Sequence, residues 1–311
     1  MFQDRTARLW DMRTHRSVKA IQGFANPDIL NTGDDEINQI ILDNRSRHLA
    51  IADDSGCPKL YDTRSHRLVW RAPQGHTNLC VSAAFSPANP HELWTGGLDA
   101  AQIQWNITAK TMVTCCADDT TTGDHSDGGN AAQICNPPFV YSLAYHPDGH
   151  QIVAGLGNGC IRVLEAESPT NHKSTKRTQR STSSRKHAQH TPLPEWHERP
   201  ALREGHGYIV SALNFLDNIH LVSAGVDGQL ALWKSSTTGP SGNNIASRRA
   251  KSQPATMNQS PYKLQGTFPT LFDKIECTAT VLAPTSWVAV GGMSSYPGTQ
   301  GVIGLYRCTE L

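Results

Sequence analysis

The sequence predicts an all-β protein built from repeats of short strands, and three observations carry this prediction. The 311 residues include 25 glycines and 18 prolines, which suits many short strands joined by tight turns. Charged residues make up only 18% of the chain, so long amphipathic helices are not expected. One pattern of polar and aromatic residues also recurs at fixed spacing, which is typical of repeat architectures.

This pattern is complete in two copies. Each copy starts at a Gly-His pair and continues through a strand-like run to a hydroxyl residue, an Asp and a Trp. The hydroxyl residue precedes the Asp by 4 positions, and the Asp precedes the Trp by 6. The members are His76, Thr95, Asp99 and Trp105 in the first copy and His206, Ser223, Asp227 and Trp233 in the second.

The residue types in this pattern suit a buried chain of hydrogen bonds. An imidazole, a hydroxyl, a carboxylate and an indole N–H can satisfy one another where water is scarce. We therefore interpret these residues as a structural network, and the Asp as a structural rather than a catalytic group.

The Gly-His to Trp-Asp pattern resembles the WD-repeat family, whose fold is a β-propeller of four-stranded blades. Weaker copies lie around Trp10 and over residues 36–62, 140–164 and 275–306. The resemblance implies a single propeller domain over residues 1–311, with five blades of three or more strands and a remnant that begins in mid-blade. We expect a seven-bladed parent, and a sequence or gene model that is truncated at its N-terminus.

Three segments between the strand-like runs are predicted to be insertions. The first, 117–132, is acidic, and its spacing does not fit a calcium loop of the EF-hand type. The other two, 168–194 and 235–260, are basic and rich in Ser and Thr, so we expect them to be disordered. They are solvated loops, nuclear-localisation signals or nucleic-acid patches. The net charge of +1 makes dedicated nucleic-acid binding unlikely.

Other sequence features argue against secretion, membranes and cofactors. The chain has no apolar run near the roughly 20 residues that span a bilayer. Its eight cysteines lack C-x-x-C or metal-ligand spacing and lie mostly in apolar runs, which predicts buried free thiols in a reducing compartment. The glycine-rich segment 155–159 leads into a β-run rather than a helix, so we interpret it as a turn. We expect an intracellular monomer, cytoplasmic or nuclear, with no metal and no cofactor.

The strongest functional signal is an aromatic-Asp-x-Arg motif at the ends of two successive repeats. One copy is Trp10, Asp11 and Arg13, and the other is Tyr61, Asp62 and Arg64. The motif resembles the one by which WD-repeat substrate receptors dock on the adaptor of cullin-4 RING ubiquitin ligases, the damage-specific DNA-binding protein. In this interpretation the Asp holds the turn, and the Arg offers paired, charge-assisted hydrogen bonds to the partner.

The leading hypothesis is therefore a non-catalytic substrate receptor or accessory subunit of such a ligase. The alternative is a general nuclear scaffold in an RNA-processing or chromatin complex, which would use the basic insertions. An enzyme would need a cluster of ionisable residues in the central channel. Residues 9–105 resemble one subfamily of WD-repeat proteins most clearly.

Overall fold

A computed structural model describes residues 8–11, 16–20, 35–65, 67–117, 137–167, 193–236, 260–281, 286–294 and 303–308. These residues contain strands and turns, and no helix among them is long and apolar enough to cross a membrane. Almost all of the predicted insertions, 117–132, 168–194 and 235–260, lies outside the described residues.

The described strands form five antiparallel sheets of three or four strands, which we call the first to fifth blades, and one separate hairpin. In each blade, strands that follow one another in the chain are hydrogen-bonded neighbours. The first blade contains β3 (Ile37–Leu42), β4 (His48–Asp53), β5 (Lys59–Asp62) and β6 (Arg67–Arg71). The second contains β7 (Cys80–Phe85), β8 (Glu92–Gly97), β9 (Ala101–Asn106) and β10 (Thr111–Ala117).

The remaining blades repeat this order. The third contains β11 (Val140–Tyr145), β12 (Gln151–Leu156), β13 (Ile161–Ala166) and β14 (Trp196–Leu202). The fourth contains β15 (Val210–Phe215), β16 (His220–Gly225), β17 (Gln229–Ser235) and β18 (Tyr262–Pro269). The fifth contains β19 (Lys274–Val281), β20 (Ser286–Met293) and β21 (Gly304–Cys308), and the hairpin pairs β1 (Arg8–Asp11) with β2 (Arg16–Ala20).

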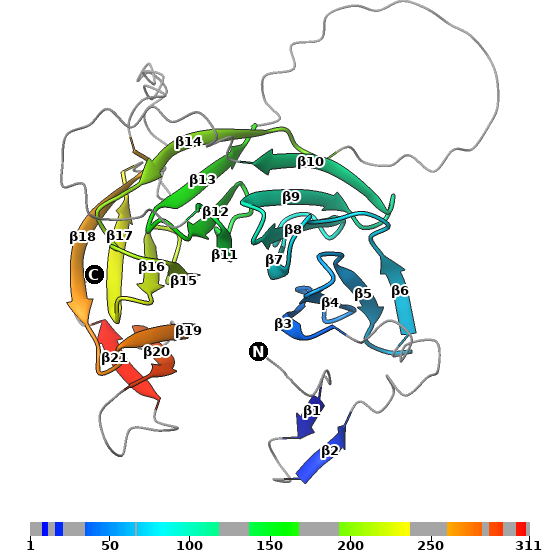
Figure 1. Cartoon of the computed structure of the whole chain (residues 1–311), viewed down its shortest axis with the longest axis horizontal. Coiled ribbons are helices and arrows are strands. Elements are labelled where there is room, and N and C mark those ends of the chain that lie inside the picture. Colours follow the sequence, from blue (N-terminus) through cyan, green and yellow to red (C-terminus); the bar gives the residue numbers. More distant parts are fainter. Residues whose placement is uncertain are drawn as a thin grey trace, which may run out of the picture.

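The blades follow one another along an arc, with their first strands facing its centre and their last strands outside (Figure 1). Neighbouring first strands are joined by polar side chains. Asn38 donates from Nδ2 to the carbonyl of Cys80 at 3.0 Å, and Ser142 donates from Oγ to the carbonyl of Val210 at 3.0 Å. This arrangement is that of a β-propeller, as the sequence predicts.

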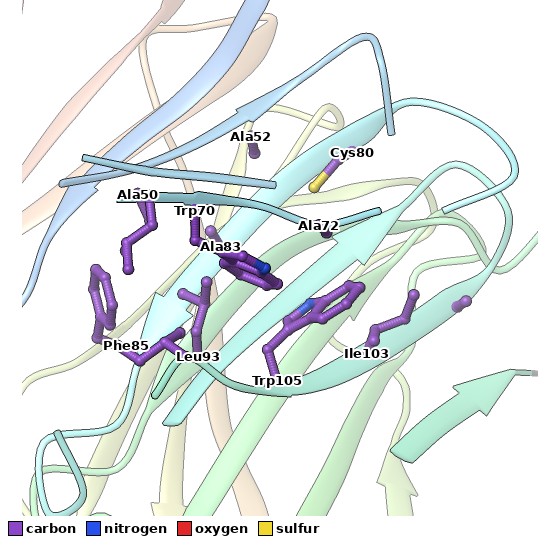
Figure 2. Packing of buried hydrophobic residues seen from close by; sticks show 13 residues of the cluster. Ala50, Ala52, Trp70, Ala72, Cys80, Ala83, Phe85, Leu93, Ile103 and Trp105 are labelled. Carbon is purple, nitrogen blue, oxygen red and sulfur yellow. The ribbon is translucent and has the colours of Figure 1, made fainter. Parts of the chain in front are cut away.

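The core consists of apolar layers between blades and within them. One cluster joins the first two blades, where Trp70 and Trp105 meet edge to face with ring centroids 5.5 Å apart (Figure 2). Further clusters join the third blade to the fourth and the fourth to the fifth. Burying a side chain of this size contributes about 1.5–3 kcal/mol, so blade contacts supply much of the stability.

The first three strands of the first, third and fifth blades span 37–62, 140–166 and 274–308, within about two residues of the predicted ranges 36–62, 140–164 and 275–306. The prediction of five blades with three or more strands is confirmed among the described residues, and β1 and β2 form a hairpin separate from them. The glycine-rich segment is confirmed as a strand-to-strand connection: β12 ends at Leu156, residues 157–159 turn, and β13 begins at Ile161. Gly159 has φ +83° there, and a Cβ at this position would lie 2.5 Å from the carbonyl oxygen of His206.

The prediction of buried thiols is only partly right. The structure describes the side chains of six cysteines, and all six are free thiols. Cys80 and Cys160 are buried, whereas Cys115 and Cys277 are exposed. Cys115 lies on an outermost strand, whose outward side has no neighbouring blade to cover it.

Candidate functional site

The first polar network holds the entry loop of the second blade against its β8–β9 turn. Trp105 donates from Nε1 to Oγ1 of Thr95 at 2.9 Å, and this oxygen lies 2.8 Å from Nε2 of His76. The other ring nitrogen of His76, Nδ1, lies 2.9 Å from Oδ1 of Asp99. Because the indole N–H can only donate, the Thr95 proton is free to go to His76, whose Nδ1–H then donates to Asp99.

The fourth blade repeats this network. Trp233 donates from Nε1 to Oγ of Ser223 at 2.8 Å, and Nε2 of His206 lies 2.8 Å from the same oxygen. Nδ1 of His206 lies 3.2 Å from each carboxylate oxygen of Asp227. The structure thus brings together all eight residues of the two repeats in which the pattern is complete.

Both aspartates have pKa values below the usual range. Burial raises the pKa of Asp99, but the hydrogen bond from His76 and those from the backbone N–H groups of Thr77 and Ala101 outweigh it. Asp227 has a lowered pKa for the same reasons, with His206 as its partner. These carboxylates are ionised near neutral pH and hold the loop amides in place.

Ser223, His206 and Asp227 have the hydrogen-bonding order of a catalytic triad, and their surroundings argue against that role. The side chain of His206 is fully buried, as is Ser223. The Ser223 oxygen already accepts the indole N–H of Trp233. A nucleophile must reach its substrate, so this set is a structural clamp rather than a reactive centre.

The first blade, which lacks a Gly-His pair, has a different polar centre. Nζ of Lys59 lies 2.5 Å from Oδ2 of Asp53 and 3.7 Å from Oδ2 of Asp35. Lys59 and Asp53 are both almost fully buried, with relative exposures of 3% and 2%. The sequence analysis missed this pair, although a Lys next to Pro58 inside an apolar strand was a signal for it.

The Arg64 motif occupies the β5–β6 turn, where Asp62 organises the backbone. Oδ1 of Asp62 accepts the backbone N–H of Arg64 at 3.0 Å and of Ser65 at 2.7 Å. These bonds lower the pKa of Asp62, with the Ser65 backbone as the largest contribution. Arg64 is exposed, whereas Tyr61 is buried against Ile37 and Ile51. Of the three predicted contact residues in this motif, Tyr61 therefore belongs to the core.

The β5–β6 turn is bonded to the β3–β4 turn, which carries further basic residues. Thr63 donates from its backbone N to the carbonyl of Arg47 at 2.9 Å and from Oγ1 to the carbonyl of Ser46 at 2.6 Å. Strands alternate in direction, so these two turns lie on one face of the ring, which we call the turn face.

The structure describes only part of the second motif copy. Trp10 and Asp11 end β1, and Arg13 lies outside the described residues.

A groove of about 530 Å³ opens beside the β3–β4 turn, between the first and second blades. Its charged lining is mainly basic: Arg45, Arg47 and Lys110 are exposed. Asp43 is the acidic residue in the lining, and it is buried and accepts the backbone N–H of Arg47 at 2.6 Å. The turn face therefore offers exposed positive charge next to Arg64, which suits an acidic protein surface.

The central cavity, of about 590 Å³, is lined by the first strands of the five blades. Its polar groups are mostly amides and hydroxyls, such as Asn38, Gln39 and Asn214. Glu276 is the only carboxylate among the described lining residues, and no His, Lys or Arg is among them. This part of the chain presents no cluster of acid and base groups of the kind that hydrolysis requires.

Comparison with known proteins matches the third blade to a family model. Residues 133–164 fit the model described as "WD domain, G-beta repeat", although this blade lacks the Gly-His pair. The chain is also similar to the WD repeat-containing protein 53 homolog of Dictyostelium discoideum, with 24% identity over 212 residues. The match covers 53% of this chain and 58% of that relative, so the chain spans somewhat over half of the relative's length. The subfamily resemblance noted in the sequence is confirmed.

Proposed function

We propose that this chain is a substrate receptor or accessory subunit of a cullin-4 RING ubiquitin ligase. The proposal starts from its β-propeller fold, its match to a WD-repeat model and its similarity to WD repeat-containing protein 53. Its general role, supported by the fold, is that of a protein-interaction scaffold without catalysis. Its specific partner is the damage-specific DNA-binding protein adaptor. The opposite face of the ring would recruit the target.

The observation that carries this proposal is the position of Arg64. The side chain is exposed on a turn whose backbone is fixed by Asp62 and by the two bonds from Thr63. A fixed turn lowers the entropy lost when an exposed Arg is immobilised in an interface. Arg47 lies in the neighbouring turn, so the basic surface continues past the motif itself.

The test is a binding measurement between purified adaptor and variants of the full chain. Arg64→Ala, alone and with Arg13→Ala, is expected to weaken binding by about tenfold or more, as for a hot-spot Arg. Arg71→Ala is the matched control, because Arg71 is also exposed and ends β6 at the opposite face of the ring. Binding that is unchanged in the double variant, with circular dichroism showing a folded chain, contradicts the assigned interface.

The alternative proposal is a general nuclear scaffold that uses the basic insertions. What supports it is their composition, with six Lys and Arg and no acidic residue in 168–186. Under this alternative, deleting 168–194 would abolish nuclear localisation or the binding of RNA-processing or chromatin partners. Under the ligase proposal the same deletion leaves adaptor binding intact.

Three accompanying proposals complete this account. We propose a seven-bladed parent ring, since five blades and a hairpin occupy only an arc in Figure 1. We propose an intracellular location, in keeping with the free thiols of the six cysteines whose side chains the structure describes. We propose a monomer before it meets the adaptor, which light scattering of the purified chain would check.

A further inference from the structure

Three potential metal ligands converge in the turn between β11 and β12, on the turn face of the third blade. One ring nitrogen of His146, a carboxylate oxygen of Asp148 and one ring nitrogen of His150 all lie within 4.8 Å of one another. Oδ1 of Asp148 lies 2.5 Å from Nδ1 of His146 and 2.7 Å from Nδ1 of His150. We propose that this turn is a binding site for a divalent transition metal, of which Zn²⁺ fits best.

The hydrogen bonds of His146 show which of its ring nitrogens is unprotonated. That nitrogen faces Asp148 and His150. Nε2 lies 3.0 Å from the carbonyl oxygen of Asn218, which can only accept, so Nε2 carries the proton. The backbone N–H of Asp148 points at Nδ1 from 3.4 Å, and that nitrogen is therefore an acceptor. A lone pair directed at a carboxylate oxygen is repulsive unless a positive charge lies between them.

This arrangement matches the usual surroundings of a metal-bound histidine. Such a ring normally donates its second N–H to a carboxylate or a backbone carbonyl, which holds the tautomer and the orientation. The carbonyl of Asn218 does this here, from the β15–β16 turn of the fourth blade. The ring is 5% exposed and meets Phe215 edge to face, with centroids 5.0 Å apart. His146 is thus a preorganised ligand.

Asp148 and His150 supply the open side of the site. Their side chains are 38% and 54% exposed, so an ion can enter from solvent. Tetrahedral Zn²⁺ with ligands at about 2.0–2.1 Å requires ligand atoms roughly 3.3 Å apart. Oδ1 of Asp148 lies closer than this to both Nδ1 atoms, at 2.5 and 2.7 Å, so the exposed Asp148 side chain would move away from each by less than about 1 Å.

The donor set selects the class of metal. Two imidazole nitrogens and one carboxylate suit Zn²⁺, Cu²⁺ or Ni²⁺, whereas Ca²⁺ and Mg²⁺ prefer oxygen alone. Three protein ligands leave one position for water. Because His146 also contacts the fourth blade, the metal would stabilise the interface between the third and fourth blades. From the sequence we expected no metal and did not single out these three residues.

The test measures Zn²⁺ uptake by the full chain after EDTA treatment and dialysis, with a chromophoric chelator as competitor. The wild type is expected to bind one equivalent more than His150→Ala and Asp148→Asn, at micromolar affinity or tighter. Asp148→Asn keeps an oxygen for the turn, so its loss of binding does not depend on misfolding. Thermal melts of both variants without metal check that the blade is intact.

His197→Ala is the matched control. This residue lies on β14 of the same blade, is 52% exposed and pairs with Glu167 at 3.1 Å, so it forms a His-carboxylate pair without a third ligand. It is expected to bind as much Zn²⁺ as the wild type, and Zn²⁺ is expected to raise the Tm of both. Equal uptake and equal Tm shifts in wild type and His150→Ala overturn the proposal, because His146 is then protonated and merely paired with Asp148.

Discussion

Nδ1 of His76 lies 2.9 Å from Oδ1 of Asp99, which joins the entry loop of the second blade to the turn between its second and third strands. The His76 side chain is fully buried, and its other nitrogen meets the hydroxyl of Thr95 at 2.8 Å. One imidazole thus links a loop, a strand and a turn. The His76 ring therefore stabilises the second blade through hydrogen bonds as well as through packing.

His76→Ala is expected to lower the free energy of unfolding by about 1–3 kcal/mol, because the buried Thr95 hydroxyl loses its acceptor. His206→Ala is expected to do the same in the fourth blade. Urea denaturation followed by tryptophan fluorescence measures both. His91→Ala is the control, since this ring bonds only to the exposed Thr108 and its loss should change stability by less than about 0.5 kcal/mol. Equal effects at His76 and His91 would contradict the clamp.

Lys59→Met is expected to destabilise the chain by about 3–5 kcal/mol, because it leaves the carboxylate of Asp53 buried without its counter-charge. Adding Asp53→Asn removes that charge and should recover most of the loss, while its side-chain oxygen still accepts from Ser55. Denaturation of the two variants and the wild type measures the difference. If the double variant is no more stable than Lys59→Met, the cost lies in packing and not in charge.

Glu92→Gln is expected to become more stable relative to the wild type as the pH rises. Burial raises the pKa of Glu92 above its ordinary value of 4.5, against the hydrogen bonds donated by Gln104, Trp94 and Trp196. The folded wild type therefore binds its proton more tightly than the unfolded chain, and it loses stability as the pH rises from about 4.5 through the folded pKa.

The measurement is the Tm difference between Glu92→Gln and the wild type from pH 4 to 8. This difference should grow with pH and level off above the folded pKa. Glu195→Gln is the control, because Glu195 is exposed and no such trend is expected. A difference that stays constant with pH would show that Glu92 ionises as freely in the folded chain as in the unfolded one.

Asp62→Ala is expected to loosen the β5–β6 turn without unfolding the first blade. The carboxylate accepts the backbone N–H groups of Arg64 and Ser65, so both amides should exchange with deuterium faster in the variant. Asp62→Asn keeps an accepting oxygen and should retain most of the protection. Exchange that is unchanged in Asp62→Ala would mean that the Thr63 bonds alone hold the turn.

The repeat spacing predicted the blades because it reflects hairpin register. Thr95 pairs with Ile103 and Leu93 pairs with Trp105, so Thr95 and Trp105 are diagonal neighbours on one face of the hairpin. Ser223 and Trp233 are related in the same way across β16 and β17. Such contacts are local in sequence, and the spacings of 4 and 6 therefore specify them directly.

The outermost strand of each blade was not predicted from the sequence, because little of its surface is buried. The strand β10 has mostly exposed residues, and β6 has one buried residue among five. Without a neighbouring blade on the outer side, such strands lack the alternation of apolar and polar residues that identifies a strand in sequence. Their place was implied only by the four-stranded blades of the family.

The sequence by itself determined the strand order, the blade repeat and the two His-to-Trp networks, because these rest on residues close together along the chain. Only the tertiary structure decided what lies next to what across blades and turns. It buried Lys59 beside Asp53, placed Arg47 next to the Arg64 turn, and set the Asn218 carbonyl against His146, 72 residues away. Such contacts depend on how curved blades pack, and residue spacing does not encode that packing.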